Sequence, residues 1–241
     1  MKKNKNSLQL PLPAKKWLAI IDRDATIFSS WELAYTCYEE AFDRVISRLY
    51  PDSQKLSKEE YTREFNPFDI DKVLKKHYPE LSEEDLDRVN EVRWQFYLDN
   101  FRERRFNEVL PGVKGFLKKF KEKGNLIAVL TTSEGDESYF HHYGLPFDEI
   151  YSMVKLKKEG MIEGGKREAI FFIIDRFNWS LDDVVTIGDR PGDHIDEILS
   201  IGVGYGLGSQ EAQEELRNSV DIYVPTVGDL HRVFGLSEEK K

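Results

Sequence analysis

Short apolar runs alternate along much of this chain with segments whose apolar residues recur every three or four positions. Uninterrupted apolar runs are typical of strands buried in a parallel sheet, and the longer spacing is typical of amphipathic helices. The strand candidates lie at 17–21, 126–130, 150–154, 184–187, 203–207 and 222–224. Helices are expected between them, at 113–120, 170–177 and 195–199. This alternation predicts an α/β fold with a doubly wound, mostly parallel sheet and helices on both faces.

The pattern differs between residues 29 and 108, where no run favours a strand. Residues 31–49 carry apolar side chains at helical spacing, and Pro51 ends that helix. Ser82 precedes three acidic residues, which is typical of a helix start. An all-helical block after the first strand predicts a second, smaller domain. We therefore expect a flexible tail at 1–15, a discontinuous core at 16–28 and 109–241, and a helical domain at 29–108.

Composition narrows the classes of function. The 241 residues are 40% hydrophobic and 33% charged, which is enough to build a core with a smaller companion domain. The net charge of -9 argues against nonspecific nucleic-acid binding, and no apolar run is long enough to span a bilayer. Cys37, the single cysteine, excludes an intramolecular disulfide, and its helical spacing predicts a core thiol. We expect a cytoplasmic protein without nucleic-acid or membrane partners.

The first strand ends in two carboxylates. Asp22 and Asp24 follow the apolar run 17–21, where ligands bind in open α/β sheets. Side chains alternate along an extended chain, so both carboxylates are expected to point the same way. Two like charges aimed at one place need a cation or a shared proton. The alternative interpretation is a solvated, Asp-rich turn.

Other strand ends also carry polar residues that suit a phosphate ligand. Thr131 and Thr132 follow the second run, and Lys166 opens the helix that precedes the fourth. Asp189 and Asp193 follow that fourth run. Each has an ordinary structural alternative: a strand-end hydroxyl, a surface lysine, or a turn and a helix N-cap.

The order of these motifs resembles that of the haloacid dehalogenase-like (HAD-like) superfamily, over the span from 17 to 234. That family has a strand followed by Asp-x-Asp-x-Thr, a strand ending in Thr or Ser, a lysine, and then Gly-Asp-x-x-x-Asp. The matching residues are Asp22-Arg23-Asp24-Ala25-Thr26, Thr131, Lys166, Gly188-Asp189 and Asp193. The resemblance implies a Rossmann-like core with an inserted helical cap and a phosphatase activity, of the kind found in phosphoglycolate phosphatase-like members.

Two positions depart from the family pattern. Ala25 stands where the family usually has glycine, so backbone conformations open only to glycine would be lost. Lys166 is followed by arginine rather than by proline. Nearby lysines compete for the same role, namely Lys155, Lys157 and Lys158.

The resemblance also implies roles for the site residues. Asp22 would be the nucleophile that forms an aspartyl-phosphate, and Asp24 would be the general acid and then the base. Mg²⁺ would be held by Asp22, the Asp24 main-chain carbonyl and Asp189. Thr131, Thr132 and Lys166 would bind the substrate phosphate. Asp193 would support Lys166 or a metal-bound water.

These residues predict a Mg²⁺-dependent phosphatase for a small phosphorylated metabolite, acting as a monomer or a homodimer. A phosphomutase would use the same pair of acids. A sugar-nucleotide glycosyltransferase would explain Asp-x-Asp alone, and a non-catalytic HAD-like binding module would keep the fold only. Because a cap residue usually contacts the substrate in this family, Arg63, Asn66 and Lys72 are candidates for that contact.

Overall fold

The chain divides into two compact units. The first comprises 1–28, 109–206 and 214–241, and the second comprises 29–108 and 207–213. A computed structural model describes residues 10–29, 31–64, 70–102, 108–132 and 137–236. Most of the predicted tail, 1–9, lies outside these residues. Leu12 is buried, and its main-chain N–H donates to the Val233 carbonyl, so this part of the chain is anchored to the first unit.

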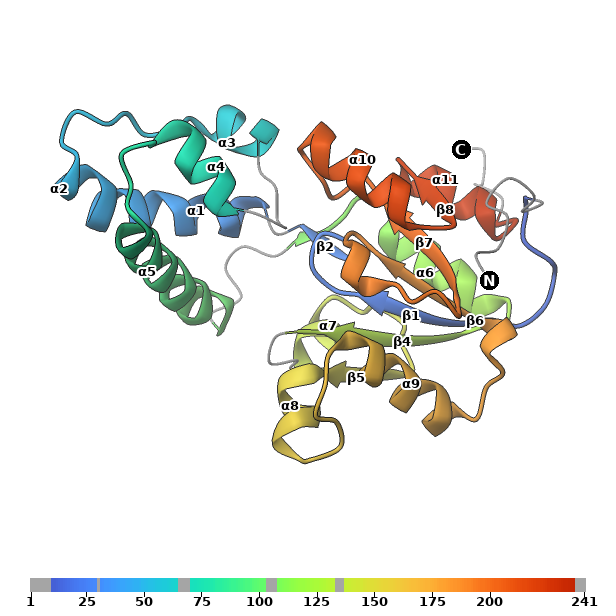
Figure 1. The fold of residues 1–241 in the computed structure, drawn as a ribbon. Coiled ribbons are helices and arrows are strands. Elements are labelled where there is room, and N and C mark those ends of the chain that lie inside the picture. The colour runs from blue at the N-terminus through green and yellow to red at the C-terminus, as the bar shows by residue number, and fades with distance from the viewer. Residues whose placement is uncertain (1–9, 30, 65–69, 103–107, 133–136, 237–241) are drawn as a thin grey trace. The chain divides into compact units, whose positions relative to one another are not determined.

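A six-stranded sheet forms the centre of the first unit (Figure 1). Its order is β5-β4-β1-β6-β7-β8, and every neighbouring pair is parallel. The strands are β1 (Leu18–Asp22), β4 (Leu126–Thr131), β5 (Glu149–Ser152), β6 (Val184–Gly188), β7 (Leu199–Val203) and β8 (Ile222–Val224). The predicted α/β architecture is thereby confirmed. Because β1 lies in the middle, its carboxyl end is flanked by those of β4 and β6.

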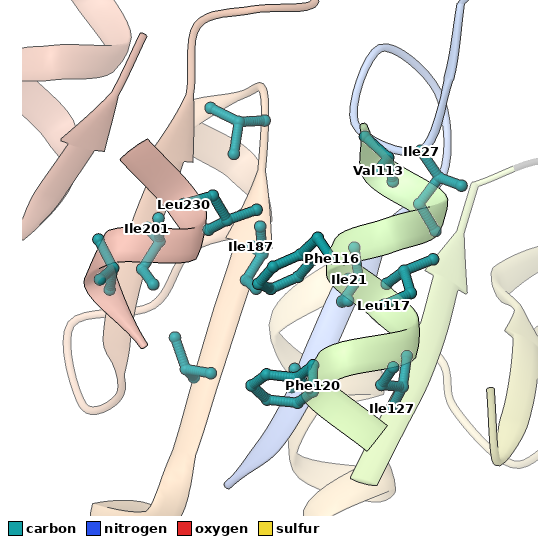
Figure 2. Packing of buried hydrophobic residues seen from close by; sticks show 14 of the residues in the cluster. Ile21, Ile27, Val113, Phe116, Leu117, Phe120, Ile127, Ile187, Ile201 and Leu230 are labelled. Atoms are coloured by element: carbon teal, nitrogen blue, oxygen red, sulfur yellow. The ribbon is translucent and has the colours of Figure 1, made fainter. Parts of the chain in front are cut away.

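Two apolar cores cover the two faces of this sheet. Ala19 and Ile21 of β1 face one core, and Leu18 and Ile20 face the other. Helix α6 (Val113–Glu122) and α11 (Val227–Val233) pack on the first face, where α6 places Phe116 against the strands (Figure 2). Helices α8 (Met153–Lys158) and α9 (Lys166–Phe177) pack on the second. Burial on both faces explains why the strands are almost wholly apolar.

The second unit is helical and is built around aromatic side chains. Its helices are α1 (Trp31–Ala41), α2 (Ser47–Leu49), α3 (Lys58–Glu64), α4 (Ile70–His77) and α5 (Glu83–Arg102), with a π-helical turn at Phe42–Ile46. Tyr38 and Tyr78 are buried and share a hydrogen bond of 2.6 Å. The Tyr38 hydroxyl also accepts from the Leu56 N–H at 2.7 Å, which fixes the loop before α3.

The remaining elements are short or lie between the main ones. They are β2 (Phe28–Ser29), β3 (Glu108–Val109), α7 (Glu137–His142) and α10 (Gln210–Ser219). No helix of the described residues is both long enough and apolar enough to cross a membrane.

Three expectations about elements are wrong. The helix expected at 195–199 is absent, because a short 3-10 turn (Pro191–Asp193) leads into β7, which pairs with β6. The strand expected at 203–207 ends at Val203 for the same reason, since β7 begins earlier. The segment 29–108, expected to lack strands, is bounded by β2 and β3, which pair with each other. Two-residue strands are too short to produce a periodic pattern.

Two glycines around the start of α6 are expected to respond in opposite ways to alanine. Gly115 is exposed inside the helix with open space around it, so Gly115→Ala should raise the free energy of unfolding by about 0.5–1 kcal/mol. Gly112 has φ +84°, so Gly112→Ala should lower it by about 1 kcal/mol. Urea denaturation of both variants measures the difference. Equal effects of the two substitutions would contradict this account.

Candidate active site

Adjacent parallel strands bring the first two candidate carboxylates together. Ile21 of β1 pairs with Ile187 of β6, so the residues that follow them, Asp22 and Gly188, lie side by side as the last residues of their strands. Asp189 comes next and is fully buried. The carboxyl ends of these central strands therefore place both carboxylates at the same edge of the sheet.

Lys166 is the lysine that reaches these carboxylates. It is the first residue of α9, and its Nζ lies 2.5 Å from Asp22 Oδ1 and also contacts Asp193 Oδ1. The side chains of Lys166, Asp22 and Asp193 are only 13%, 11% and 5% exposed. The three competing lysines, Lys155, Lys157 and Lys158, are all exposed.

Three carboxylates form a compact cluster around this lysine. Oxygen atoms of Asp22, Asp189 and Asp193 all lie within 4.8 Å of one another. Asp189 Oδ2 is buried and has no hydrogen-bond partner in the described residues, and the Arg190 Nε lies 3.9 Å away. Hard oxygen ligands with an unsatisfied buried oxygen fit a divalent cation such as Mg²⁺.

The pKa values of Asp22, Asp189 and Lys166 reflect the balance of charge in the cluster. Burial raises the pKa of Asp22 to about 6, against the attraction of Lys166, and the neighbouring aspartates add to the rise. Burial also raises the pKa of Asp189, helped by Asp193 and Asp22. For Lys166, burial acts against the charged form, but the two carboxylates outweigh it and raise the pKa. Negative charge therefore exceeds what one ammonium neutralises.

Asp24 lies outside this cluster of carboxylates and pairs with Arg23. Arg23 Nη2 lies 2.6 Å from Asp24 Oδ2, and Nε lies 3.2 Å from Oδ1, which is a two-point contact. Arg23 is only 1% exposed, so its charge is buried beside the site. Sequence reasoning missed this residue. The signal was present, because Arg23 continues the inward alternation of Ala19 and Ile21.

The hydroxyl candidates occupy different positions around the strand ends. Thr131 is buried at the end of β4, and Thr132 follows it and is exposed. Thr26, the last residue of the first motif, is buried with its Oγ1 3.5 Å from Asp189 Oδ1. Thr131 therefore adjoins the carboxyl end of β1, and Thr26 adjoins the carboxylate cluster.

Ala25 adopts the conformation for which the family uses glycine. Its φ is +55°, in the left-handed region, which an alanine can enter at some cost in free energy. Gly206 lies against this turn, and a Cβ added there would fall 1.7 Å from the Ala25 carbonyl oxygen. The Tyr205 hydroxyl donates to the Thr26 carbonyl at 3.2 Å, which holds the same two segments together.

Gly206→Ala is expected to lower the free energy of unfolding by about 3 kcal/mol or more, because the main chain of Ala25 must move. The matched control is Gly192→Ala, whose added Cβ would meet nothing within 4 Å. That variant should stay within about 0.5 kcal/mol of the parent protein. Chemical denaturation of both proteins checks this, and a Gly206→Ala protein as stable as the control would refute the close approach.

Comparisons with known proteins identify the family and the fold. A family profile described as haloacid dehalogenase-like hydrolase matches residues 19–196. The fold is similar to that of a predicted phosphatase from Clostridium acetobutylicum, which is 25% identical in sequence. The TM-score is 0.62, and the match covers 90% of this chain and 96% of that chain. It is also similar to that of a predicted phosphoglycolate phosphatase from Haemophilus somnus, which is 15% identical in sequence. The TM-score is 0.63, and the match covers 92% of this chain and 98% of that chain.

A third similar structure, from Bacteroides vulgatus, is provisionally described as a beta-phosphoglucomutase. It is 15% identical, with a TM-score of 0.59 and 92% of this chain and 89% of that chain covered. No protein in the search of curated proteins matches the sequence.

Proposed function

We propose that this chain, which belongs to the haloacid dehalogenase-like hydrolase family, is a Mg²⁺-dependent phosphatase that hydrolyses a small phosphomonoester. One observation carries the proposal. A buried lysine bridges Asp22 and Asp193 beside a buried aspartate with an unsatisfied oxygen, at the carboxyl ends of the central strands. Phosphoryl transfer depends mainly on positioning and on neutralising charge, and this cluster supplies both.

Asp22 is the proposed nucleophile. Its Oδ attacks phosphorus, the bond to the ester oxygen breaks, and an aspartyl-phosphate forms. The contact from Lys166 orients the carboxylate and offers positive charge to the transferring group. Asp193 in turn holds Lys166 from the other side, so the ammonium stays aimed at the reacting atoms.

Asp24 is the proposed acid and base. It gives a proton to the leaving oxygen in the first step and takes one from the attacking water in the second, which releases phosphate and restores Asp22. Its side chain is 26% exposed, against 1% for Arg23, so the carboxylate remains accessible while the arginine holds it. Thr131 is the proposed donor to a phosphate oxygen, and Thr132 is proposed to contribute from the same strand end.

The acidic cluster fits a Mg²⁺ ion. Asp22 and Asp189 would hold it, with the Asp24 main-chain carbonyl that the family resemblance implies, and Asp193 would be the third carboxylate nearby. When bound, Mg²⁺ would act as a Lewis acid that neutralises charge on the phosphate oxygens.

Hydrolysis of 4-nitrophenyl phosphate tests the nucleophile. Activity should require Mg²⁺, disappear with a chelator, and fall at least about a thousandfold in Asp22→Asn, because the amide cannot form the phosphoenzyme. The control is Asp196→Asn, which changes an exposed acid three residues after Asp193 and should keep full activity. Unchanged activity of Asp22→Asn would refute the mechanism, and interconversion of two sugar phosphates without release of inorganic phosphate would establish a mutase.

A burst experiment tests the separate role of Asp24. In Asp24→Asn, 4-nitrophenol is a good leaving group and needs little acid assistance, so about one equivalent should be released rapidly. Steady turnover should then fall by about 10²–10⁴, because water lacks its base. Stopped-flow absorbance at the nitrophenolate band measures both phases. An equal loss of the burst rate and the turnover rate would contradict the assignment.

A further inference from the structure

An arginine occupies the inward face of α5 in the helical unit. Leu86 and Val89 of this helix are buried in the apolar core. Arg93 lies seven residues after the first and four after the second, which places it on the same face of the helix. The hydrophobic pattern of the helix predicts an apolar residue at this position, but the chain has a charged residue there.

Two polar side chains from neighbouring helices lie near this guanidinium, and neither is negatively charged near pH 7. Burial raises the pKa of the Cys37 thiol on α1 to about 12, and the positive charge of Arg93 opposes that rise. Burial likewise raises the pKa of the Tyr61 hydroxyl on α3 to about 12, again opposed by Arg93. Both groups lie close enough to feel the charge, and both stay neutral near pH 7.

Asn90 fixes the orientation of Arg93. The Arg93 Nη1 donates to Asn90 Oδ1 at 2.8 Å. The amide nitrogen of Asn90 donates to Asp71 Oδ1 at 2.8 Å, so the amide is held with its oxygen toward the guanidinium. One donor of the guanidinium is therefore positioned, and its buried Nε has no hydrogen-bond partner in the described residues.

Arg93 stands apart from the other arginines of this acidic protein. Among arginines whose side chains the structure describes, each other one is exposed or pairs with a carboxylate, as Arg23 does with Asp24. Arg93 is partly buried, has no carboxylate within ion-pair distance among the described residues, and its buried Nε lacks a hydrogen-bond partner there. A partly buried charge of this kind is unfavourable unless an anion pairs with it.

We propose that Arg93, with Tyr61 beside it, forms a binding site for a small oxyanion, a carboxylate or a phosphate, in the helical unit. The planar guanidinium fork matches two oxygen atoms of such a group, which a chloride ion cannot match. The candidates expected from the sequence fit less well. Arg63 is exposed, Lys72 pairs with Glu211 at 2.5 Å, and Asn66 lies outside the described residues.

A free small acid or inorganic phosphate supplies an oxyanion of this chemistry, and such a ligand would bind independently of catalysis.

The direct test follows the ¹H–¹⁵N resonance of Arg93 Nε in the full-length protein, assigned by its absence in Arg93→Lys. Glycolate and inorganic phosphate are titrated at constant ionic strength against sodium chloride. A saturable shift with either oxyanion, absent with chloride, is expected. The exposed Arg88 of the same helix, which pairs with Glu84, is the internal control and should not shift. This measurement does not depend on enzymatic activity.

The absence of any saturable shift with either oxyanion would overturn the proposal. Calorimetric titration checks the same binding in Arg93→Lys, which keeps the charge and loses the fork, so the affinity for the oxyanion should fall about tenfold or more. Arg88→Lys should leave that affinity unchanged. A protein inactive on every phosphate ester would refute the proposed phosphatase, while the resonance of Arg93 would still report whether the anion site exists.

Discussion

The contact of one ammonium with two carboxylates organises the carboxyl ends of the central strands. Lys166 Nζ contacts Asp22 at the end of β1 and Asp193 in the turn after β6. Its ammonium therefore links the start of α9 to the carboxyl ends of two strands. The three side chains are largely buried, so their charges are poorly screened by solvent. The lysine lessens the repulsion between the carboxylates, and their charge keeps the lysine protonated despite its burial. Neither partner would be stable at this depth without the other.

The parallel sheet is what makes this arrangement possible. Its strands are buried on both faces, so polar groups are excluded along their length and gather where the strands end. β1 lies between β4 and β6, and the three carboxyl ends carry Asp22, Thr131 and Asp189. The buried Arg23 adds a second cation on the opposite side of the strand and holds Asp24. The site thus has a cluster of three carboxylates beside Lys166, and a fourth carboxylate, Asp24, that pairs with Arg23 instead.

Much of the fold could be predicted from the pattern of the chain. Apolar runs located β1, β4, β6 and β8, because strands buried on both faces have uninterrupted apolar sequences. The helix from residue 31 and the one after Ser82 also followed from spacing and caps. The pattern failed after Asp193, where Ile195 and Ile198 are buried in a turn that precedes β7. Helical spacing and a buried turn cannot be told apart over so few residues.

The sequence by itself determined the order of the chemical groups: two aspartates after one strand, threonines after another, and an Asp-x-x-x-Asp after a third. This order sufficed to indicate the family and the reaction class, because each group follows a strand whose end is predictable. Only the tertiary structure decided which lysine reaches the carboxylates, that Asp24 pairs with its own neighbour, and that Arg93 lacks a counter-charge among the described residues. These outcomes depend on distances between residues far apart in the chain and on burial, and neither is encoded in local spacing.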